Sequence, residues 1–413
     1  MKRTRVAYVT SWDPDDVGSL SGSVYFVRKA LEDAGLDVTV VAPLKYKWPT
    51  VHLWVWQGYN KLGKNYHIER APVPVRDYNR QADEALRDLD VDVIFSPETI
   101  PVCLLHDSRP LVFHTDATFD GLVDYYAGFT NMPRACLHSG HAIDQAALSR
   151  CTLAIYTSEW AAETARTLYD VDPAKLRVVP LGANVMDAPS DDELAQAIAG
   201  RPPGSCELLF IYRGDWVRKG GPRALEIVAE LARRGRPVRL TTIGPIRDIP
   251  EHIRPFARQL GLLNKSVPAE AAQYRKAMTD SQFLVLPSEA ECFSFAAAEA
   301  CAFALPVLAT WTGGLPEVIR DGENGCLFDL GAPAAEWSDC IESLLADRSR
   351  YEALCRQVAS SYKERLNWQT NGARIAAIVV EASREHNSRR PPTWSRARRP
   401  RARTRTPLWW EPF

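Results

Sequence analysis

Short runs of apolar residues alternate with amphipathic stretches along most of this chain. A continuous apolar run bounded by turn residues is typical of a strand buried on both faces, as in a parallel sheet. Apolar residues at every third or fourth position predict a helix packed against such a sheet. The pattern predicts strands at 5–10, 37–42, 91–96, 111–113, 152–156, 177–180, 207–212, 238–243, 282–286 and 306–309.

Amphipathic helices are predicted between these strands and after the last of them. They are expected at 24–34, 81–89, 142–149, 159–168, 223–233, 337–346, 350–363 and 370–381, with a further helix after the strand at 282–286. Two such alternations, separated by a polar, proline-bearing stretch, predict an α/β fold with two Rossmann-like parallel-sheet domains. The expected units are an N-terminal domain at 1–186, an interdomain connection at 187–206, a C-terminal domain at 207–365, a C-terminal helix at 366–386 that packs back on the N-terminal domain, and a disordered basic tail at 387–413.

The loop and helix after the strand at 282–286 hold the strongest candidate site. Such a loop lies at the carboxyl end of its strand, where open α/β sheets bind ligands, and the helix N-terminus attracts anions. Ser294 is a predicted N-cap, and Ala296 is small enough to let a pyrophosphate approach. Glu291 and Glu299 would lie about 12 Å apart along a helix, too far for a glycosidase pair. They suit the two ends of one long ligand or, alternatively, are two solvated carboxylates.

A second candidate loop follows the predicted strand at 207–212. It carries Arg213, Lys219 and several glycines. Backbone amides together with an arginine and a lysine are what a diphosphate requires. The spacing is not that of a P-loop, and the loop at 11–23 lacks the dinucleotide fingerprint.

A histidine ends the predicted strand at 111–113. His114 would lie where ligands bind, and its near-neutral pKa suits hydrogen bonding or proton transfer, although a lone histidine is often structural. Asp13, Asp15 and Asp16 sit in a Pro- and Gly-bearing loop, which is typical of turns. We therefore expect no metal site.

The stretch at 45–74 departs from the alternation. It combines tyrosines and tryptophans with four lysines and an arginine. Such a surface would suit stacking on a sugar or the edge of a membrane. The alternative is a pair of strands with the aromatic side chains in the core.

Composition narrows the function classes. Of 413 residues, 46% are apolar and 24% charged, which is typical of a globular protein. The net charge of −1 hides nine arginines and one acid at 384–405, so the rest of the chain is acidic and no nucleic-acid partner is expected. Nine cysteines without a CxxC pair predict reduced core thiols. With no signal-like or membrane-spanning run, we expect a cytoplasmic protein, with the inner face of a membrane as a site of peripheral contact.

Four ordered motifs together resemble those of the family 4 glycosyltransferases, which are retaining enzymes of the GT-B fold. The resemblance covers about residues 4–385 and also includes the segments at 158–163, 172–184 and 321–325. The motifs are Glu291-x7-Glu299, the pair Arg213 and Lys219, Phe113-His114-Thr115, and Thr312-Gly313-Gly314-Leu315-Pro316-Glu317.

The resemblance implies retaining transfer of a hexose-type sugar from a nucleotide-diphosphate sugar, without a metal or other cofactor. It implies that Glu291 contacts the donor sugar, Glu299 the ribose hydroxyls, and His114 the space beside the sugar. Arg213 and Lys219 would neutralise the leaving diphosphate. The remaining residues expected at the donor are Phe293, Ser294, Phe295, Ala296 and Gly22.

Two departures from the family pattern concern these residues. The family's first loop often carries paired glycines, where this chain has Ser21-Gly22-Ser23, and small alanines precede Glu299 in place of larger aliphatic residues. A sugar-nucleotide epimerase of the same fold and an inert nucleotide-sugar-binding scaffold stay open as alternatives. The sequence does not specify the base, the sugar, the acceptor (a glycan, a lipid or a small molecule) or the oligomeric state.

Overall fold

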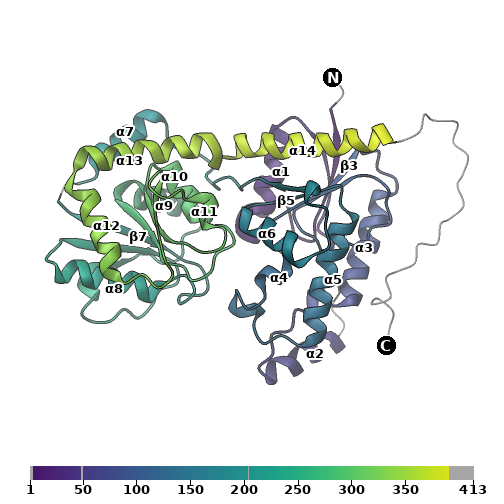
Figure 1. The fold of residues 1–413 in the computed structure, drawn as a ribbon, viewed down its shortest axis with the longest axis horizontal. Coiled ribbons are helices and arrows are strands. Elements are labelled where there is room, and N and C mark those ends of the chain that lie inside the picture. Colours follow the sequence, from purple (N-terminus) through teal and green to yellow (C-terminus); the bar gives the residue numbers. More distant parts are fainter. Residues whose placement is uncertain (1–2, 48–49, 203, 390–413) are drawn as a thin grey trace, which may run out of the picture.

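Two six-stranded parallel sheets form the two halves of the molecule (Figure 1). The computed structural model describes residues 3–47, 50–202 and 204–389. The strand orders are β2-β1-β3-β4-β5-β6 and β12-β11-β10-β7-β8-β9, which confirms the predicted fold class. The strands are β1 (Arg5–Val9), β2 (Asp37–Val41), β3 (Val93–Ser96), β4 (Leu111–Thr115), β5 (Leu153–Tyr156), β6 (Leu176–Val178), β7 (Cys206–Ile211), β8 (Val238–Ile243), β9 (Ala257–Gln259), β10 (Phe283–Leu286), β11 (Val307–Thr310) and β12 (Gly325–Phe328).

Helices cover both faces of each sheet, because the strands are apolar on both sides. Helices α1 and α14 pack on one face of the first sheet, and α3 and α5 pack on the other. The helices are α1 (Ser23–Asp33), α2 (Thr50–Lys61), α3 (Pro72–Leu86), α4 (Phe119–Leu122), α5 (Arg134–Arg150), α6 (Glu159–Leu168), α7 (Asp191–Gly200), α8 (Gly221–Arg233), α9 (Pro268–Asp280), α10 (Phe295–Ala302), α11 (Leu315–Val318), α12 (Ala334–Ala346), α13 (Arg348–Ser361) and α14 (Trp368–Arg389).

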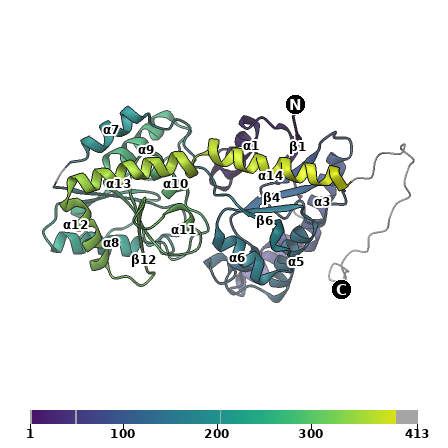
Figure 2. The same ribbon diagram turned by 45° about the horizontal axis from the view of Figure 1, so that its top comes forward.

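The chain crosses between the halves twice. The first crossing runs from Val179, which is hydrogen-bonded to β5, to Asn184, which contacts the second half. The second lies at Leu366, at the end of the π-helical turn η6 (Tyr362–Leu366), where the Leu366 carbonyl accepts a hydrogen bond from Ala183 N. Beyond it, α14 lies along the first half, as α13 lies along the second (Figure 2). The two crossings therefore lie side by side.

The stretch at 187–206, predicted as a connection without secondary structure, contains helix α7. The N-terminus of α7 carries a capping box in which Glu193 N donates to Ser190 Oγ over 3.3 Å. Leu194 and Ile198 of this helix are buried in the core of the second half. The crossing comes before α7, because an amphipathic helix in this polar stretch has its own apolar face to bury.

Two other predictions need correction. The alternative of a strand pair at 45–74 is wrong, because α2 and the start of α3 occupy this stretch. The tail predicted from residue 387 begins inside α14, which continues to Arg389, and residues 390–413 lie outside the described part of the chain. Among the described helices, none has the length and apolar character needed to cross a membrane.

Candidate active site

The candidate site is built on the unit β10, loop, α10. Strand β10 is fully buried and ends at Leu286, and the loop that follows turns into α10 at Ser294. Ser294 is the N-cap, as predicted, because its Oγ accepts a hydrogen bond from Ala297 N over 3.3 Å. Ala297 is fully buried, so the first turn of α10 is packed closely into the core. The unit presents a helix N-terminus at the carboxyl edge of the second sheet.

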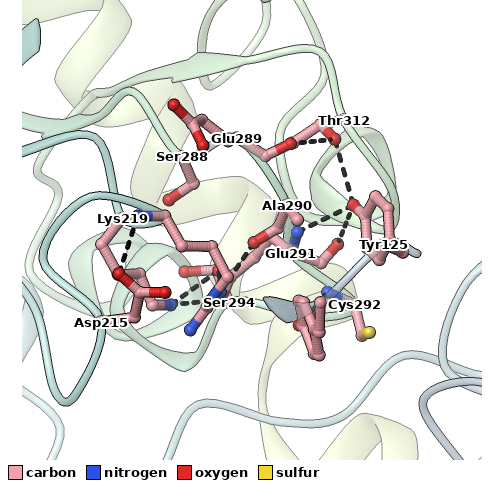
Figure 3. Close-up of polar contacts among 12 residues, drawn as sticks. Tyr125, Asp215, Lys219, Ser288, Glu289, Ala290, Glu291, Cys292, Ser294 and Thr312 are labelled. Carbon is pink, nitrogen blue, oxygen red and sulfur yellow. Dashed lines mark hydrogen bonds and ion pairs between the residues drawn. The ribbon is translucent and has the colours of Figure 1, made fainter. Parts of the chain in front are cut away.

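Glu291 is the centre of a charged cluster on this loop (Figure 3). Glu291 is 4% exposed, and Lys219 Nζ lies 2.7 and 2.6 Å from its two carboxylate oxygens. Arg218 Nη1 donates to the same carboxylate over 3.2 Å and to the Ala290 carbonyl over 2.7 Å. Arg213, the other predicted member of the basic pair, is exposed and forms no ion pair in the part of the chain that the structure describes. The loop between β7 and α8 therefore brings Lys219 and Arg218 to Glu291.

Gly220 explains how the basic loop reaches the β10 loop. Its backbone is left-handed, with φ of 79°, and a Cβ there would lie 1.9 Å from the Pro287 carbonyl oxygen. No larger residue fits at this distance. Lys219 next to it is thereby held against Glu291.

Glu299 lies on the buried side of α10 and is 3% exposed. Lys265 pairs with one of its oxygens, and the Tyr274 hydroxyl donates to the other. Burial, reinforced by the carboxylate of Glu299, raises the pKa of Tyr274 and keeps its proton available for this bond. Lys265 Nζ also donates to the Asn184 carbonyl over 3.0 Å. Glu299 is thus connected to the crossing between the halves.

Gly22 lies at the same crossing. It has a left-handed φ of 91° at the start of α1, and a Cβ would lie 2.9 Å from the side-chain nitrogen of Asn184. That nitrogen donates to the Ser21 carbonyl over 2.6 Å, and Trp368 donates to the other side-chain atom of Asn184 over 2.9 Å. Gly22 and Glu299, both predicted at the donor, are therefore linked through Asn184 and Lys265.

His114 is buried at the end of β4 and, within the described part of the chain, forms no hydrogen bond or ion pair with the charged cluster. Its Nε2 lies 3.1 Å from the Val179 carbonyl oxygen. Because a carbonyl only accepts, Nε2 carries the proton and Nδ1 is the free acceptor. Burial lowers the pKa of His114 to about 4, against the raising effect of the bond to Val179. The imidazole is neutral at neutral pH.

The predicted aromatic donor residues lie at the start of α10. Phe293 is buried and Phe295 half-buried, with their rings 5.3 Å apart in an edge-to-face arrangement. Both contact the hydrophobic cluster that joins the two halves, as does the partly buried Ala296. They anchor the end of the loop that carries Glu291 in this cluster.

The two halves meet at Tyr125 and Tyr126, which follow α4. Tyr125 Oη accepts from Glu291 N over 2.8 Å and lies 3.0 Å from Thr312 Oγ1, as Figure 3 shows. Tyr126 Oη accepts from Cys292 N over 3.0 Å, and the Arg218 guanidinium lies 4.6 Å from the centre of its ring. Two tyrosines of the first half thus hold the backbone of the loop after β10 through hydrogen bonds.

Asp116, two residues after His114, faces the same cluster. Asp116 is exposed to solvent. Partial desolvation by the neighbouring protein and, to a lesser extent, the nearby charge of Glu291 raise the pKa of Asp116. The cluster therefore gains a carboxyl group from the first half.

Two family models match the chain in the order of its two halves. The model described as Glycosyltransferase Family 4 matches residues 22–186, and the model described as Glycosyl transferases group 1 matches residues 206–347. The chain belongs to the family 4 glycosyltransferases. The resemblance seen in the motifs is confirmed.

Relatives named D-inositol 3-phosphate glycosyltransferase are similar to this glycosyltransferase over part of its length. The protein of Segniliparus rotundus is 33% identical over 223 residues, 52% of this chain and 49% of the relative. The protein of Paenarthrobacter aurescens is 30% identical over 225 residues, 52% of this chain and 53% of the relative. The chain spans about half the length of these curated relatives.

Solved structures share the fold over almost the whole chain. Sucrose-phosphate synthase from Thermosynechococcus elongatus has a TM-score of 0.65 at 18% identity, covering 92% of this chain and 99% of that one. HepE of Anabaena, solved in complex with UDP-glucose, has a TM-score of 0.60 at 15% identity, covering 92% and 100%. At these identities the likeness shows the fold alone.

Several residues of this glycosyltransferase site were not predicted. Arg218 contacts Glu291, whereas the motif spacing favours Arg213 as the partner of Lys219. Lys265 and Tyr274 lie on a loop and a helix for which no element was predicted. Tyr125 acts across the halves, 166 residues away from its partner, and no local pattern indicates such a contact.

Proposed function

We propose that this chain transfers a hexose-type sugar, with retention of configuration, from a nucleotide-diphosphate sugar to an acceptor. The observation that carries the proposal is Glu291, buried and held by Lys219 and Arg218 beside the N-terminus of α10. Glu291 would accept hydrogen bonds from the donor sugar. A sugar diphosphate needs hydrogen-bond acceptors for its hydroxyls and cationic donors for its phosphates. The carboxylate and the two cations at this sheet edge offer both.

The leaving diphosphate would be neutralised by protein cations. Lys219 Nζ has three protons, and its two contacts with Glu291 leave one for a phosphate oxygen. Arg213 is exposed on the same loop and completes the predicted pair. The N-terminus of α10 adds a partial positive charge. We propose on this basis that the reaction needs no divalent cation, since charge on the leaving group is already offset.

Glu299 would accept the ribose hydroxyls. Lys265 and Tyr274 fix its carboxylate from two sides, and a carboxylate with about four acceptor positions retains room for further donors. His114 would lie beside the sugar with a neutral imidazole, which does not compete with positive charge developing in an oxocarbenium-like transition state.

Uridine is the base that we propose first. The HepE structures of the same fold were solved with UDP and with UDP-glucose. The curated relatives carry a glycosyltransferase name, which supports transfer rather than epimerisation. The cytoplasmic setting predicted from the sequence is part of this proposal.

Proton NMR of the full-length chain incubated with UDP-glucose and a panel of other nucleotide sugars tests the proposal. We expect slow release of the sugar as the α-anomer, the configuration of the donor. Glu291→Gln should abolish this release. Glu289→Gln is the matched control, because Glu289 is exposed on the same loop and its carboxylate forms no hydrogen bond or ion pair with the described residues. Formation of a nucleotide sugar with one inverted centre would indicate an epimerase. If no donor were turned over, the chain would be an inert nucleotide-sugar-binding scaffold.

A further inference from the structure

Helix α2 exposes large apolar side chains on all sides. None of its residues is buried, whereas a surface helix normally buries one apolar face. Exposed apolar side chains that form a contiguous patch commonly mark a site of interaction with a protein, a ligand or a membrane. The exposed apolar residues of α2 and of the turn after it are Val51 (57% exposed), Leu53 (45%), Trp54 (69%), Val55 (39%), Trp56 (42%) and Leu62 (74%).

Positive charge surrounds this apolar helix. The stretch 45–64 holds four lysines and no acidic residue. Lys45 and Lys47 precede α2, and Lys61 ends it, all with exposed side chains. An apolar helix flanked by lysines therefore stands out from a chain whose remainder, without the arginine-rich tail, is acidic.

The two ends of α2 are attached to the first half. His52 near its start stacks on Tyr46, with ring centres 5.8 Å apart. After its end, Asn65 donates to the Ala127 and Thr130 carbonyls, each over 2.9 Å. Figure 1 shows α2 at the outer end of the first half, beyond α4 and α5 and away from α14. The helix is held in place while its apolar side chains stay in solvent.

We propose that α2 docks on the headgroup region of an anionic lipid bilayer. Tryptophan rings favour this region because they are apolar with one polar N–H, and lysines beside them reach lipid phosphates. Each lysine near an anionic surface raises the affinity about fivefold. A helix of 12 residues is too short to span the hydrocarbon core, so it would lie in the plane of the interface.

The attachment of α2 leads towards the candidate site. Ala127 and Thr130, which hold Asn65 beyond the end of α2, lie in the short segment that follows Tyr125 and Tyr126. Those two tyrosines grip the loop of Glu291. A membrane bound at α2 would therefore be connected through this segment to the loop of Glu291, and an acceptor carried by that membrane could reach the candidate site. This last consequence rests on the proposed function, whereas the docking itself does not.

Co-sedimentation of the full-length chain with vesicles tests the docking without any turnover. Vesicles of phosphatidylcholine with about a third phosphatidylglycerol are compared with vesicles of phosphatidylcholine only. We expect the double variant Trp54→Ser/Trp56→Ser to lose at least tenfold in affinity for the anionic vesicles. The control is Ile246→Ser, which removes an apolar side chain from the second half that is 72% exposed, against 69% for Trp54. Circular dichroism establishes that each variant is folded.

The arginine-rich tail also attracts anionic lipid, so the decisive comparison is between variants that all keep it. Unchanged vesicle binding of the tryptophan variant would overturn the proposal. So would a dimer of the wild type that this variant dissociates in analytical ultracentrifugation, since a second copy would then cover α2. Donor hydrolysis measured in the same samples without vesicles reports on the proposed function separately.

Discussion

At the scale of single residues, each of the two carboxylates of the candidate site is held by a lysine. Lys219 contacts both oxygens of Glu291, and Lys265 contacts Glu299. A buried carboxylate without a partner is costly, so these lysines stabilise the protein as well as the site. Their substitution should therefore affect turnover and stability together, and the controls must separate the two.

Lys219→Ala is expected to lower kcat for a nucleotide-sugar donor by about 10²–10³-fold, the range for losing one preorganised donor to a developing charge. Arg213→Ala should also lower kcat, while leaving the melting temperature unchanged because Arg213 is exposed and unpaired among the described residues. Initial rates with and without EDTA check both. If EDTA stopped the wild type while Arg213→Ala stayed fully active, a metal would be carrying this charge.

Glu299→Gln should weaken UDP binding by about 1–3 kcal/mol, the cost of losing hydrogen bonds to a charged acceptor. The amide keeps the size of the carboxylate, so Tyr274 can still donate to its oxygen. Isothermal titration calorimetry with UDP measures the change. Glu317→Gln, on α11, is the comparison, and equal UDP affinity of the two variants would remove Glu299 from the ribose.

His114 makes stability depend on pH. Its pKa is about 4 in the folded protein and near 6.5 in the unfolded chain, so the unfolded chain binds the proton more readily. The free energy of unfolding is therefore full above pH 6.5 and falls as the pH drops towards 4. Between pH 7 and pH 5 the His114 share is about 2 kcal/mol.

His114→Gln should flatten this pH profile, since its amide nitrogen can still donate to Val179 without titrating. Urea unfolding at pH 7 and pH 5 measures the difference. His252→Gln, at an exposed position, should leave the wild-type profile unchanged. A His114→Gln profile as steep as that of the wild type would assign the acid sensitivity to other groups.

At the scale of elements, close packing between loops fixes the site. Gly313 has a left-handed φ of 49°, and a Cβ there would lie 2.2 Å from both the Glu291 carbonyl oxygen and Tyr125 Oη. Gly314 is packed as closely, with a Cβ position 1.8 Å from the Cys292 carbonyl oxygen. The loop before α11 can approach the Glu291 loop only because it lacks side chains here.

Gly313→Ala should therefore push the two loops apart, lowering the melting temperature by several degrees and weakening donor binding. The matched control is Gly331→Ala, because a Cβ at Gly331 meets nothing within 4 Å. Thermal shift with and without UDP reads out both effects. Equal behaviour of the two variants would show that the contact yields easily.

Elements with strong apolar patterns were predictable, and those stabilised by distant contacts were not. The buried runs of β8 and the amphipathic α6 were predicted at their observed bounds. Strand β9, with an exposed Arg258, has too little apolar character to indicate an edge strand. Helix α2 could not be predicted, because its apolar residues lie on every side of the helix and give no helical periodicity. Glu291 and Glu299 could be named from a motif, whereas Lys265 and Tyr125 join them only through the fold.

At the scale of the whole molecule, the halves are joined by two adjacent crossings and by the tyrosine contact opposite. The crossings pass Asn184 and Leu366, and domains joined in this way are expected to move about them. Tyr125 and Tyr126 would then hold the two halves together at the loop of Glu291.

The double variant Tyr125→Phe/Tyr126→Phe should shift the molecule towards an open arrangement, because it removes both acceptors of the Glu291 and Cys292 amides. Small-angle X-ray scattering is expected to give a larger radius of gyration, and a saturating donor should reverse part of it. Tyr25→Phe, in α1, is the comparison variant. Identical scattering of all three proteins would show that these bonds do not control closure.

Helix α14 has a consequence for the order in which the chain folds. Ile375 and Val379 of this helix complete the core on the α1 face of the first sheet, and a Cβ at Gly372 would lie 2.7 Å from that of Ala30. When the strands of the first sheet have emerged from the ribosome, one apolar face of that sheet is therefore still incompletely covered. It stays so until the second half has been synthesised. The N-terminal half is completed by almost the last residues of the described chain, so its folding during translation depends on a segment that does not yet exist.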